Sequence, residues 1–450
     1  MHAVDTPSSP RMPARRGAMV LLAAIAAGLA LSAPARAETT IRFWHAMNGV
    51  LGEVLDAQVA RFNASQKDYK VVATYKGTYE EVMQAGLAAT GAQAPHVLQV
   101  FEVGTANMMA RPRSVKPAFQ LMADAKEKLD PRQFFPAVAA HFSDNKGKLY
   151  ALPFNISTPV LFYNRDAFAK AGLDPDKPPR TWMELQAVAI KLTDSGATQC
   201  GITTGWQSWV HLENVAAWHN EPVATRDNGY TGLDAKLNFN GQLMIRHISL
   251  LSSWVKSGLF SYAGREEEAE ARFLSGDCGL ITTSSAAISA MNAKAKFAVG
   301  VGQLPYYDDF KGAPYNTLIG GAGLWAMGGH GAADYKGVAK LFAFLSRPEV
   351  EADWHERTGY LPVSRESLEL SKKRGYFTRT PGALVPMQQL ARKTDVFDKG
   401  IRLGNFLQIR HVVDEELEHV WTGKKTPKEA LDEAVERGNV LLRRFERTQK

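Results

Sequence analysis

The sequence predicts an α/β protein of two lobes, each a mostly parallel sheet flanked by helices, joined by hinge crossings. Short apolar runs alternate with helical patterns between Glu38 and Phe101, which is typical of a parallel sheet covered on both faces. Two extended segments, 152–164 and 297–305, contain or precede proline and fit a chain that passes from one sheet to another. The 413 residues after position 37 are enough for two domains with hydrophobic cores.

The first 37 residues have the pattern of a cleavable export signal. Arginines precede an apolar run at 18–33, and Ala35-Arg36-Ala37 has the small-x-small form of a cleavage site after Ala37. The run is shorter than the roughly 20 residues that a membrane-spanning helix needs. No cysteine follows it, which argues against a lipid anchor. We therefore expect an exported, soluble protein that begins at Glu38.

Charge gives no support for nucleic-acid binding. Loss of residues 1–37 removes four arginines and one aspartate and lowers the net charge from +7 to +4. No cluster of Lys and Arg with interleaved aromatic residues occurs. We therefore expect no nucleic-acid partner.

The two cysteines have similar surroundings, because Cys200 and Cys278 each precede glycine and an apolar strand run. An oxidising compartment permits a disulfide, and a bridge is geometrically reasonable if the two strands are neighbours. The sequence therefore does not decide whether these two cysteines form a disulfide.

The first lobe should present several loops at one rim. The expected elements are strands 41–44, 70–75 and 96–101 and helices 51–62 and 80–89. Ligands of parallel sheets bind beyond the carboxyl ends of the strands. The loops at 45–47, 77–79 and 102–104 should therefore lie together.

The segment LPFNISTPVLFYN (152–164) places a polar gap between two extended apolar runs. A ligand held between two lobes would sit at such a gap, so Ser157 and Thr158 are candidate cleft residues. An ordinary surface loop is the alternative interpretation, and a helix from 165 to about 172 should follow.

Tryptophans are concentrated in the next region. Thr181 and Glu184 have the spacing of a capping box, with Trp182 as the first helical residue. Indoles often stack on sugar or polyol faces, whereas core packing is the alternative for each one alone. We expect at least one of this group in the cleft. The group comprises Trp182, Trp206, Trp209 and Trp218.

A strand at 279–283 ends in Ser284 and Ser285 before a helix, which could create an anion site through free N–H groups. Ser284 could equally serve only as a helix cap. The glycine-rich run 319–323 allows a backbone to approach a ligand closely but fits no nucleotide-binding fingerprint. The last third is expected to be helical, with a second capping box from Thr426.

Motifs of metal and hydrolytic chemistry are absent from the sequence: it has no HExxH, no G-x-S-x-G and no metal-spaced Cys/His set. His411 and Glu415 have helical i, i+4 spacing but no further partners, which is usual for a surface pair. We expect no enzyme, no cofactor and no metal site.

Several segments together resemble one family: FWHAMNG, YKGTYEE, FEVGTA, PFNISTPVLFYN, GWQSWVHLEN, TGYLPVS, RLGNFLQIR and VDEELEHVWTGKKTPKEALDEA. They are similar to the periplasmic sn-glycerol-3-phosphate-binding subunits of ABC importers, within the type II solute-binding superfamily that includes maltose-binding proteins. The resemblance runs through the whole mature chain. One departure is Ile156, where many relatives have a small polar residue.

The resemblance implies two lobes that close over a ligand by hinge motion. The implied boundaries are residues 38–153 and a return segment 301–330 for the N-terminal lobe. Residues 154–300 and a helical remainder 331–450 would form the C-terminal lobe.

The resemblance also implies the ligand-binding residues. Tyr79 and Glu102 would hold the glycerol hydroxyls, and Trp182 would pack on the glycerol. The residues around the phosphate would be Ser157, Ser284, the Gly321 backbone, Tyr360 and Arg410. Because Glu102 would repel phosphate, the carboxylate and the Arg410 guanidinium are expected near opposite ends of the ligand.

The implied function is capture of sn-glycerol 3-phosphate, and of glycerophosphodiesters such as glycerophosphocholine, in the periplasm. The implied partners are an inner-membrane ABC permease with its ATPase, and the receptor is expected to be monomeric. The alternatives are an oligosaccharide receptor of the same superfamily and a secreted phosphodiesterase.

Overall fold

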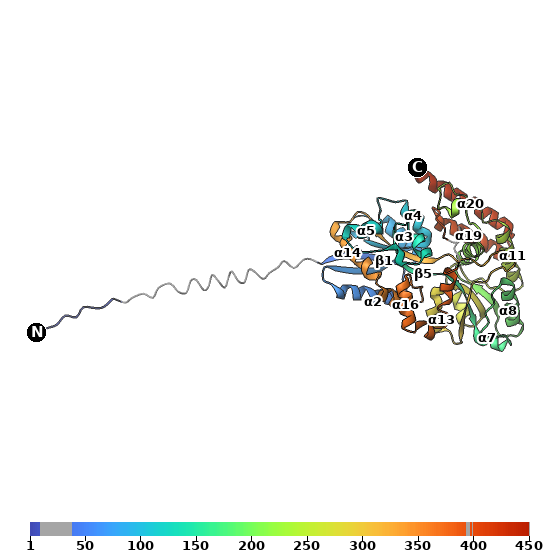
Figure 1. Ribbon diagram of the computed structural model, residues 1–450, viewed down its shortest axis with the longest axis horizontal. Coiled ribbons are helices and arrows are strands. Elements are labelled where there is room, and N and C mark those ends of the chain that lie inside the picture. Colours follow the sequence, from blue (N-terminus) through green and yellow to red (C-terminus); the bar gives the residue numbers. More distant parts are fainter. Residues whose placement is uncertain (10–37, 393–396, 398, 450) are drawn as a thin grey trace.

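The computed structural model describes residues 1–9, 38–392, 397 and 399–449, and it has two lobes that lie side by side (Figure 1). Most of the predicted export signal falls on residues 10–37, outside the described residues. Within the described ranges, no helix combines the length and apolar composition that a bilayer span requires.

The first lobe is built on a mixed sheet with strand order β2-β1-β3-β10-β4, in which β5 also pairs with β10. β1 runs parallel to β2 and β3, whereas β10 is antiparallel to its neighbours. The central strand β3 is buried along its length, which explains its continuous apolar run. The strands are β1 (Thr39–His45), β2 (Tyr69–Tyr75), β3 (Val97–Phe101), β4 (Val115–Lys116), β5 (Leu152–Ser157) and β10 (Gly320–Met327).

Helices cover this sheet and form its loops. They are α2 (Gly49–Ser65), α3 (Tyr79–Ala88), η1 (Gly91–Gln93), η2 (Glu102–Gly104), α4 (Thr105–Met109), α5 (Ala118–Ala125), η3 (Pro131–Gln133), α6 (Pro136–Phe142), α14 (Ala332–Leu345) and α15 (Pro348–Thr358). The predicted rim is confirmed, because the parallel strands β1, β2 and β3 place residues 45–47, 77–79 and 102–104 after their carboxyl ends.

The second lobe has a sheet of order β7-β8-β6-β9. β7 and β8 are parallel, but β6 is antiparallel to both β8 and β9. The two-lobe α/β fold is as expected, but antiparallel pairs outnumber parallel pairs in both sheets, so neither sheet is mostly parallel. β6 carries the chain into the lobe and β9 carries it out, so these two neighbours must run in opposite directions. The strands are β6 (Pro159–Asn164), β7 (Cys200–Thr204), β8 (Cys278–Ser284) and β9 (Val299–Gln303).

Most of the remaining helices belong to the second lobe. They are α7 (Arg165–Lys170), α8 (Trp182–Asp194), η4 (Trp209–Asn214), α9 (Val215–Trp218), α10 (Thr225–Asn228), α11 (Gln242–Lys256), α12 (Glu270–Leu274), η5 (Ser285–Ala287), α13 (Ile288–Lys294), α17 (Tyr376–Arg379), α18 (Val385–Leu390), α19 (Phe406–Trp421) and α20 (Pro427–Gln449). α16 (Arg365–Lys373) packs against α15 and α17. Both predicted capping boxes form, at Thr181 and at Thr426.

The chain crosses between the lobes where the sequence predicts its first crossing. β5 belongs to one sheet and β6 to the other, with Thr158 between them (Figure 1). The return crossing follows β9 and lies at 304–319, later than predicted. A third crossing lies at 359–364, where Leu361 N donates to Ile156 O at 2.7 Å.

Two predicted lobe boundaries are wrong. Residues 301–303 end β9 in the second lobe, and α14 and α15 pack on the first lobe rather than the second. α14 contacts β1 and α5, while Gln58 on α2 donates to Val350 O on α15 at 3.2 Å. An amphipathic stripe shows that a helix has a buried face, but not which of two sheets that face covers.

Cys200 and Cys278 form a disulfide between the first residues of two adjacent parallel strands. The two residues are register partners, with their Cα atoms 4.5 Å apart. Strand pairing therefore decides the question that the sequence left open.

We expect removal of this disulfide to destabilise the second lobe. A loop closed over 78 residues restricts the unfolded chain, and losing such a bridge costs about 2–4 kcal/mol. The double variant Cys200→Ser/Cys278→Ser should unfold at lower urea than the oxidised wild type. Reduced wild type should match the variant, and equal midpoints for all three would contradict the prediction.

The core of the second lobe contains three histidines in one hydrogen-bonded group. His211 Nδ1 lies 3.1 Å from His247 Nε2, and His247 Nδ1 lies 3.0 Å from the Tyr307 hydroxyl. His219 Nε2 accepts from Tyr307 N at 2.9 Å. Burial lowers the pKa of His211 to about 3 and that of His219 to about 4, and it takes the pKa of His247 well below its usual value.

These histidines should make stability fall in acid. The unfolded chain takes up protons below about pH 6.5, whereas the folded lobe resists protonation until about pH 4. Their contribution is therefore complete above pH 6.5 and is lost as pH falls toward 4. Between pH 6.5 and 4, the melting temperature of His219→Gln should fall less steeply with decreasing pH than that of wild type. Parallel curves would exclude His219 as a cause.

Candidate ligand-binding site

Tyr79, Glu102 and Asn155 come from the first lobe and meet second-lobe residues at the crossing strands. Tyr79 is the first residue of α3, and its ring stacks on Phe101 with centroids 5.4 Å apart. Its hydroxyl accepts from Asn155 Nδ2 at 2.6 Å and lies 3.4 Å from the Tyr360 hydroxyl. Two predicted residues, Tyr79 and Tyr360, are thus brought together.

A relay of amides fixes the Tyr79 hydroxyl. Gln99 Oε1 accepts from Ala46 N at 2.7 Å, and Gln99 Nε2 donates to Asn155 Oδ1 at 2.8 Å. Burial raises the pKa of Tyr79 well above its usual value, so the phenol keeps its proton at neutral pH. Gln99 and Asn155 were not among the residues predicted from the sequence, although a polar residue inside a buried apolar strand was a visible signal.

Ser157 and Gly321 lie on paired strands next to this relay. Ser157 is the register partner of Gly320, and Gly321 is the partner of Ile156. Gly321 has φ +96°, and a Cβ there would collide with the Asn155 carbonyl oxygen, so the position requires glycine. Ser157 is buried, and among the described residues its hydroxyl has no hydrogen-bond partner.

Ser284 lies across the first crossing, where it pairs with Pro159. Its hydroxyl accepts from Ala286 N at 3.2 Å, which makes it the cap of η5. Ser285 N donates to Thr158 O at 2.9 Å, so the start of η5 is tied to the crossing. Capping is therefore observed, and a role toward a ligand stays a prediction.

A charged triad joins the lobes beside this group. Arg410 on α19 donates to both carboxylate oxygens of Glu213, from Nε at 2.7 Å and from Nη2 at 2.8 Å. Nη2 also donates to Glu102 Oε1 at 2.8 Å. The side chains of Arg410, Glu102 and Glu213 are only 9, 10 and 5% exposed.

The triad contradicts the expectation that Glu102 and Arg410 lie near opposite ends of a ligand. They form a direct ion pair, because α19 packs against η2 at the lobe junction. Burial raises the pKa of Glu102, with Arg410 opposing the shift. Burial alone would lower the pKa of Arg410, but Glu213 and Glu102 outweigh it and raise that pKa.

Two atoms of the triad remain free to contact a ligand. In the described part of the chain, neither Arg410 Nη1 nor Glu102 Oε2 has a hydrogen bond to another residue, and neither is fully enclosed. A guanidinium only donates and a carboxylate only accepts, whereas a hydroxyl does both. The pair is therefore suited to hydroxyl groups.

The prediction for Trp182 is wrong, because its side chain is 0% exposed. It packs in the core of the second lobe against His211, His247 and Tyr307 and offers no face for stacking. Another tryptophan of the same group, Trp209, lies closer to the predicted site. A Cβ on Gly320 would be 2.6 Å from Trp209 Cζ2, so the indole packs directly on the strand that pairs with Ser157.

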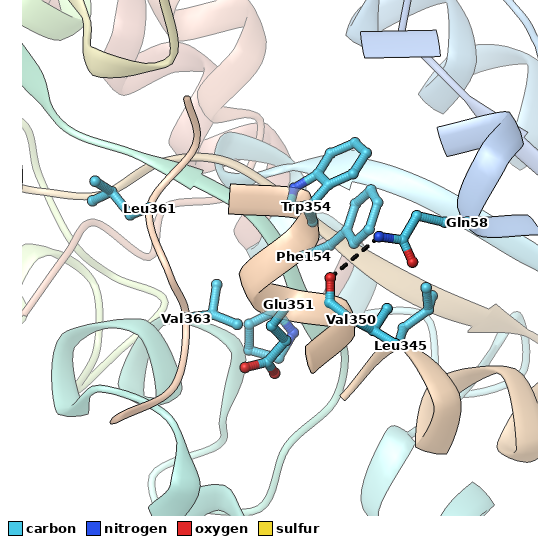
Figure 2. A pocket seen from close by; sticks show the side chains of 9 residues that line it. Gln58, Phe154, Leu345, Val350, Glu351, Trp354, Leu361 and Val363 are labelled. Carbon is cyan, nitrogen blue, oxygen red and sulfur yellow. Dashed lines mark hydrogen bonds between the residues drawn. The ribbon is translucent and has the colours of Figure 1, made fainter. Parts of the chain in front are cut away.

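Two hollows are lined by other residues. Figure 2 shows a cavity of about 20 Å³ lined by Gln58, Glu351 and Trp354, which has room for a single water molecule. A groove of about 750 Å³ is lined by residues that include Arg132, Tyr230 and Arg402. No predicted site residue lines either hollow.

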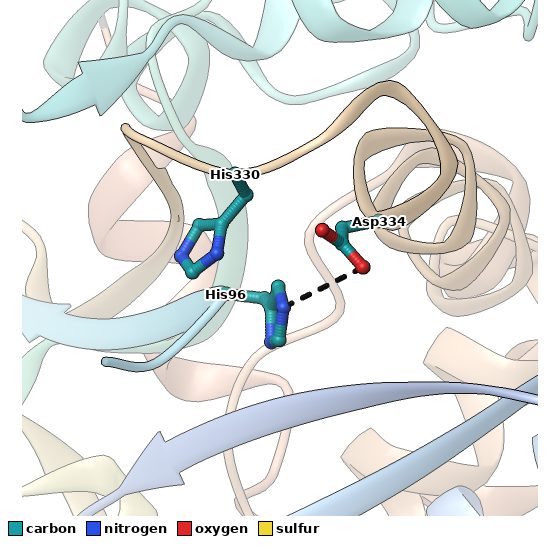
Figure 3. Close-up of side chains that lie close together, drawn as sticks. All are labelled: His96, His330 and Asp334. Carbon is teal, nitrogen blue, oxygen red and sulfur yellow. Dashed lines mark ion pairs between the residues drawn. The ribbon is translucent and has the colours of Figure 1, made fainter. Parts of the chain in front are cut away.

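His96, His330 and Asp334 form the cluster in Figure 3, but their hydrogen bonds do not suit a metal. His96 Nδ1 accepts from Arg42 N at 2.9 Å, so the neutral ring carries its proton on Nε2. That nitrogen lies 3.8 Å from Asp334 Oδ1 and would have to lose its proton to bind a cation. The positive charge of Arg42 nearby opposes a cation further.

Two α/β lobes joined by crossing strands, with polar residues from both lobes at the junction, define a two-lobe solute-binding protein. The chain belongs to the bacterial extracellular solute-binding protein family, whose profile matches residues 57–382.

Curated relatives match nearly the whole chain. The sn-glycerol-3-phosphate-binding periplasmic protein UgpB of Yersinia pseudotuberculosis is 51% identical over 95% of this chain and 97% of its own length. UgpB of Escherichia coli O6:K15:H31 is also 51% identical, over 95% of this chain and 98% of its own.

Solved structures share the fold. UgpB from Mycobacterium tuberculosis in complex with glycerophosphocholine matches with a TM-score of 0.77 at 22% identity, covering 91% of this chain and 99% of that one. Maltose-bound MalE3 of T. maritima matches with a TM-score of 0.73 at 18% identity, covering 89% and 98%.

We expect Arg410→Ala to destabilise the protein as well as its site. The change leaves Glu102 and Glu213 buried without their shared cation, and breaking a buried pair typically costs about 3–5 kcal/mol. Urea unfolding without ligand measures this loss.

Arg265→Ala is the matched control for this change. Arg265 makes a similar fork to Glu418 on α19, but both side chains are partly exposed. Its loss should cost less than about 1 kcal/mol. Equal costs for the two variants would mean that the triad is not a buried structural contact.

Proposed function

We propose that this protein is a non-enzymatic periplasmic receptor that captures sn-glycerol 3-phosphate and delivers it to the permease of an ABC importer. Glycerophosphodiesters such as glycerophosphocholine are proposed as further ligands. The main support is the junction of Glu102, Arg410 and Tyr79 in a chain half identical to UgpB proteins along nearly all of its length.

The glycerol end of the ligand would lie at Glu102 and Arg410. A hydroxyl there donates to Glu102 Oε2 and accepts from Arg410 Nη1, which are the free atoms of the triad. The buried Tyr79 hydroxyl is held by Asn155 beside the same end.

The phosphate end would lie at the crossing strands. Ser157, Ser284 and Tyr360 supply hydroxyl groups, and Gly321, with φ +96° within β10, allows the backbone to approach the ligand closely. The Nε–Nη2 fork of Arg410 is then not available to phosphate, because Glu213 and Glu102 already occupy its three N–H bonds. This assigns the guanidinium to the opposite end from that implied by the sequence resemblance.

Thermal melting with a ligand panel tests the proposal. A ligand that binds only the folded state adds about 2.7 kcal/mol at a hundredfold excess over Kd. Glycerol 3-phosphate should raise the melting temperature and give saturable heat in calorimetry. Maltose and inorganic phosphate are the controls and should leave melting unchanged.

Other outcomes of the panel have distinct meanings. A rise with maltose alone would identify an oligosaccharide receptor instead. Release of choline from glycerophosphocholine, in proportion to protein concentration, would identify a phosphodiesterase. A monomer mass in light scattering is expected with and without ligand.

A further inference from the structure

Glu213 is a buried carboxylate beside the ligand site, and each of its two oxygens already accepts a hydrogen bond. It lies in η4, a π-helical turn, and both of its oxygens accept hydrogen bonds from Arg410. The residue is 4% exposed. Its contacts therefore act on Arg410 rather than on a ligand.

The position of Glu213 is fixed independently of Arg410. The next residue, Asn214, accepts from Leu318 N at 2.7 Å through Oδ1 and donates to Trp209 O at 3.0 Å through Nδ2. Leu318 belongs to the second crossing segment. The π-helical turn is thus anchored to the chain that joins the lobes, and Glu213 is a rigid partner for the long Arg410 side chain.

The fork selects which edge of the guanidinium remains available. Glu213 occupies the edge formed by Nε and Nη2, and the second hydrogen of Nη2 goes to Glu102. Within the described residues, Nη1 is then the guanidinium nitrogen without a hydrogen bond, and Oε2 is the Glu102 oxygen without one. Without Glu213, the Nε–Nη2 edge would be open, and that fork matches the oxygens of a phosphate.

We propose that Glu213 is a positioning residue that sets the orientation of the ligand. It holds Arg410 so that Nη1 and Glu102 Oε2 together bind hydroxyl groups, and it denies the guanidinium fork to phosphate. The formal charge of the three side chains is −1, which repels an anionic group from this end. The identity of the ligand rests on the proposed function.

Glu213→Gln tests this role by removing the charge while keeping the size of the side chain. Its amide nitrogen cannot accept from Arg410, so one bond of the fork is lost. Calorimetry should show glycerol 3-phosphate binding weakened by at least about tenfold, which corresponds to about 1.4 kcal/mol. Glu213→Asp keeps the charge and should lose less affinity than the amide.

Glu418→Gln is the matched control. Glu418 accepts the same type of fork from Arg265 at 2.8 and 2.6 Å, near the other end of α19. This variant should bind within about twofold of wild type. An equal loss for Glu418→Gln would reduce the Glu213 effect to general damage to the helix and overturn the proposal.

A double-mutant cycle separates positioning from a merely structural role. If Glu213 acts through Arg410 and Glu102, then Glu102→Gln/Glu213→Gln should bind no more than about threefold worse than the weaker single variant. If the two substitutions acted independently, their fold-changes in Kd would instead multiply. Multiplied losses, or wild-type affinity for Glu213→Gln, would overturn the proposal.

The outcomes distinguish this inference from the proposed function. Wild type that does not bind glycerol 3-phosphate refutes the proposed function before any variant is compared. Wild type that binds while Glu213→Gln is unaffected refutes only the positioning role. If Glu213→Gln does not fold, Glu213→Asp carries the comparison, because its shorter side chain moves the carboxylate away from Arg410 and should still weaken binding. Wild-type affinity for Glu213→Asp then counts against the proposal.

Discussion

The ion triad of Glu102, Arg410 and Glu213 is the constraint on which the lobe junction depends. One guanidinium is shared by a carboxylate from the first lobe and a carboxylate from the second. Buried charges are costly unless they are paired and hydrogen-bonded, and here three hydrogen bonds join the guanidinium to the two carboxylates. The arrangement of the two lobes places Glu102 beside Arg410, so the geometry of the site depends on that arrangement.

The crossing strands supply the second half of that geometry. β5 and β10 belong to the first sheet, yet each is continuous with a segment that leads to the second lobe. Gly321 allows β10 to pass Asn155 closely, and Leu361 pairs with Ile156 from the third crossing. Hydroxyl groups at these strands are held on rigid backbone, while the triad depends on α19. A ligand between them would contact both the crossing strands and α19.

The second lobe is stabilised by features that lie away from the site. The disulfide ties the first residues of β7 and β8, and the histidine group is held neutral by burial beside Tyr307. Trp182 belongs to this core. Its position at a helix start gave no indication of burial, because the aromatic cage that encloses it comes from distant segments. Trp209 differs because its π-helical turn lies beside the crossing.

The amino-acid sequence by itself determined the local elements, the first crossing and the rim of the first lobe. Alternating β and α patterns fix the parallel strands β1 to β3, and the polar gap at Ser157 marks the exit from the first sheet. Resemblance supplied Tyr79, Tyr360 and Arg410 as candidates. The strands, the helices and the first crossing are properties of short segments, and residue propensity, capping and strand spacing decide them.

Only the tertiary structure decided which lobe α14 and α15 cover, which tryptophan is enclosed, and where Arg410 directs its hydrogen bonds. Each of these depends on contacts between residues far apart in the chain, such as Arg410 with Glu102 and Glu213. Charge and spacing in one sequence do not reveal that two carboxylates share one guanidinium. This sharing of the guanidinium is the reason why the proposed function assigns Arg410 to hydroxyl groups rather than to phosphate.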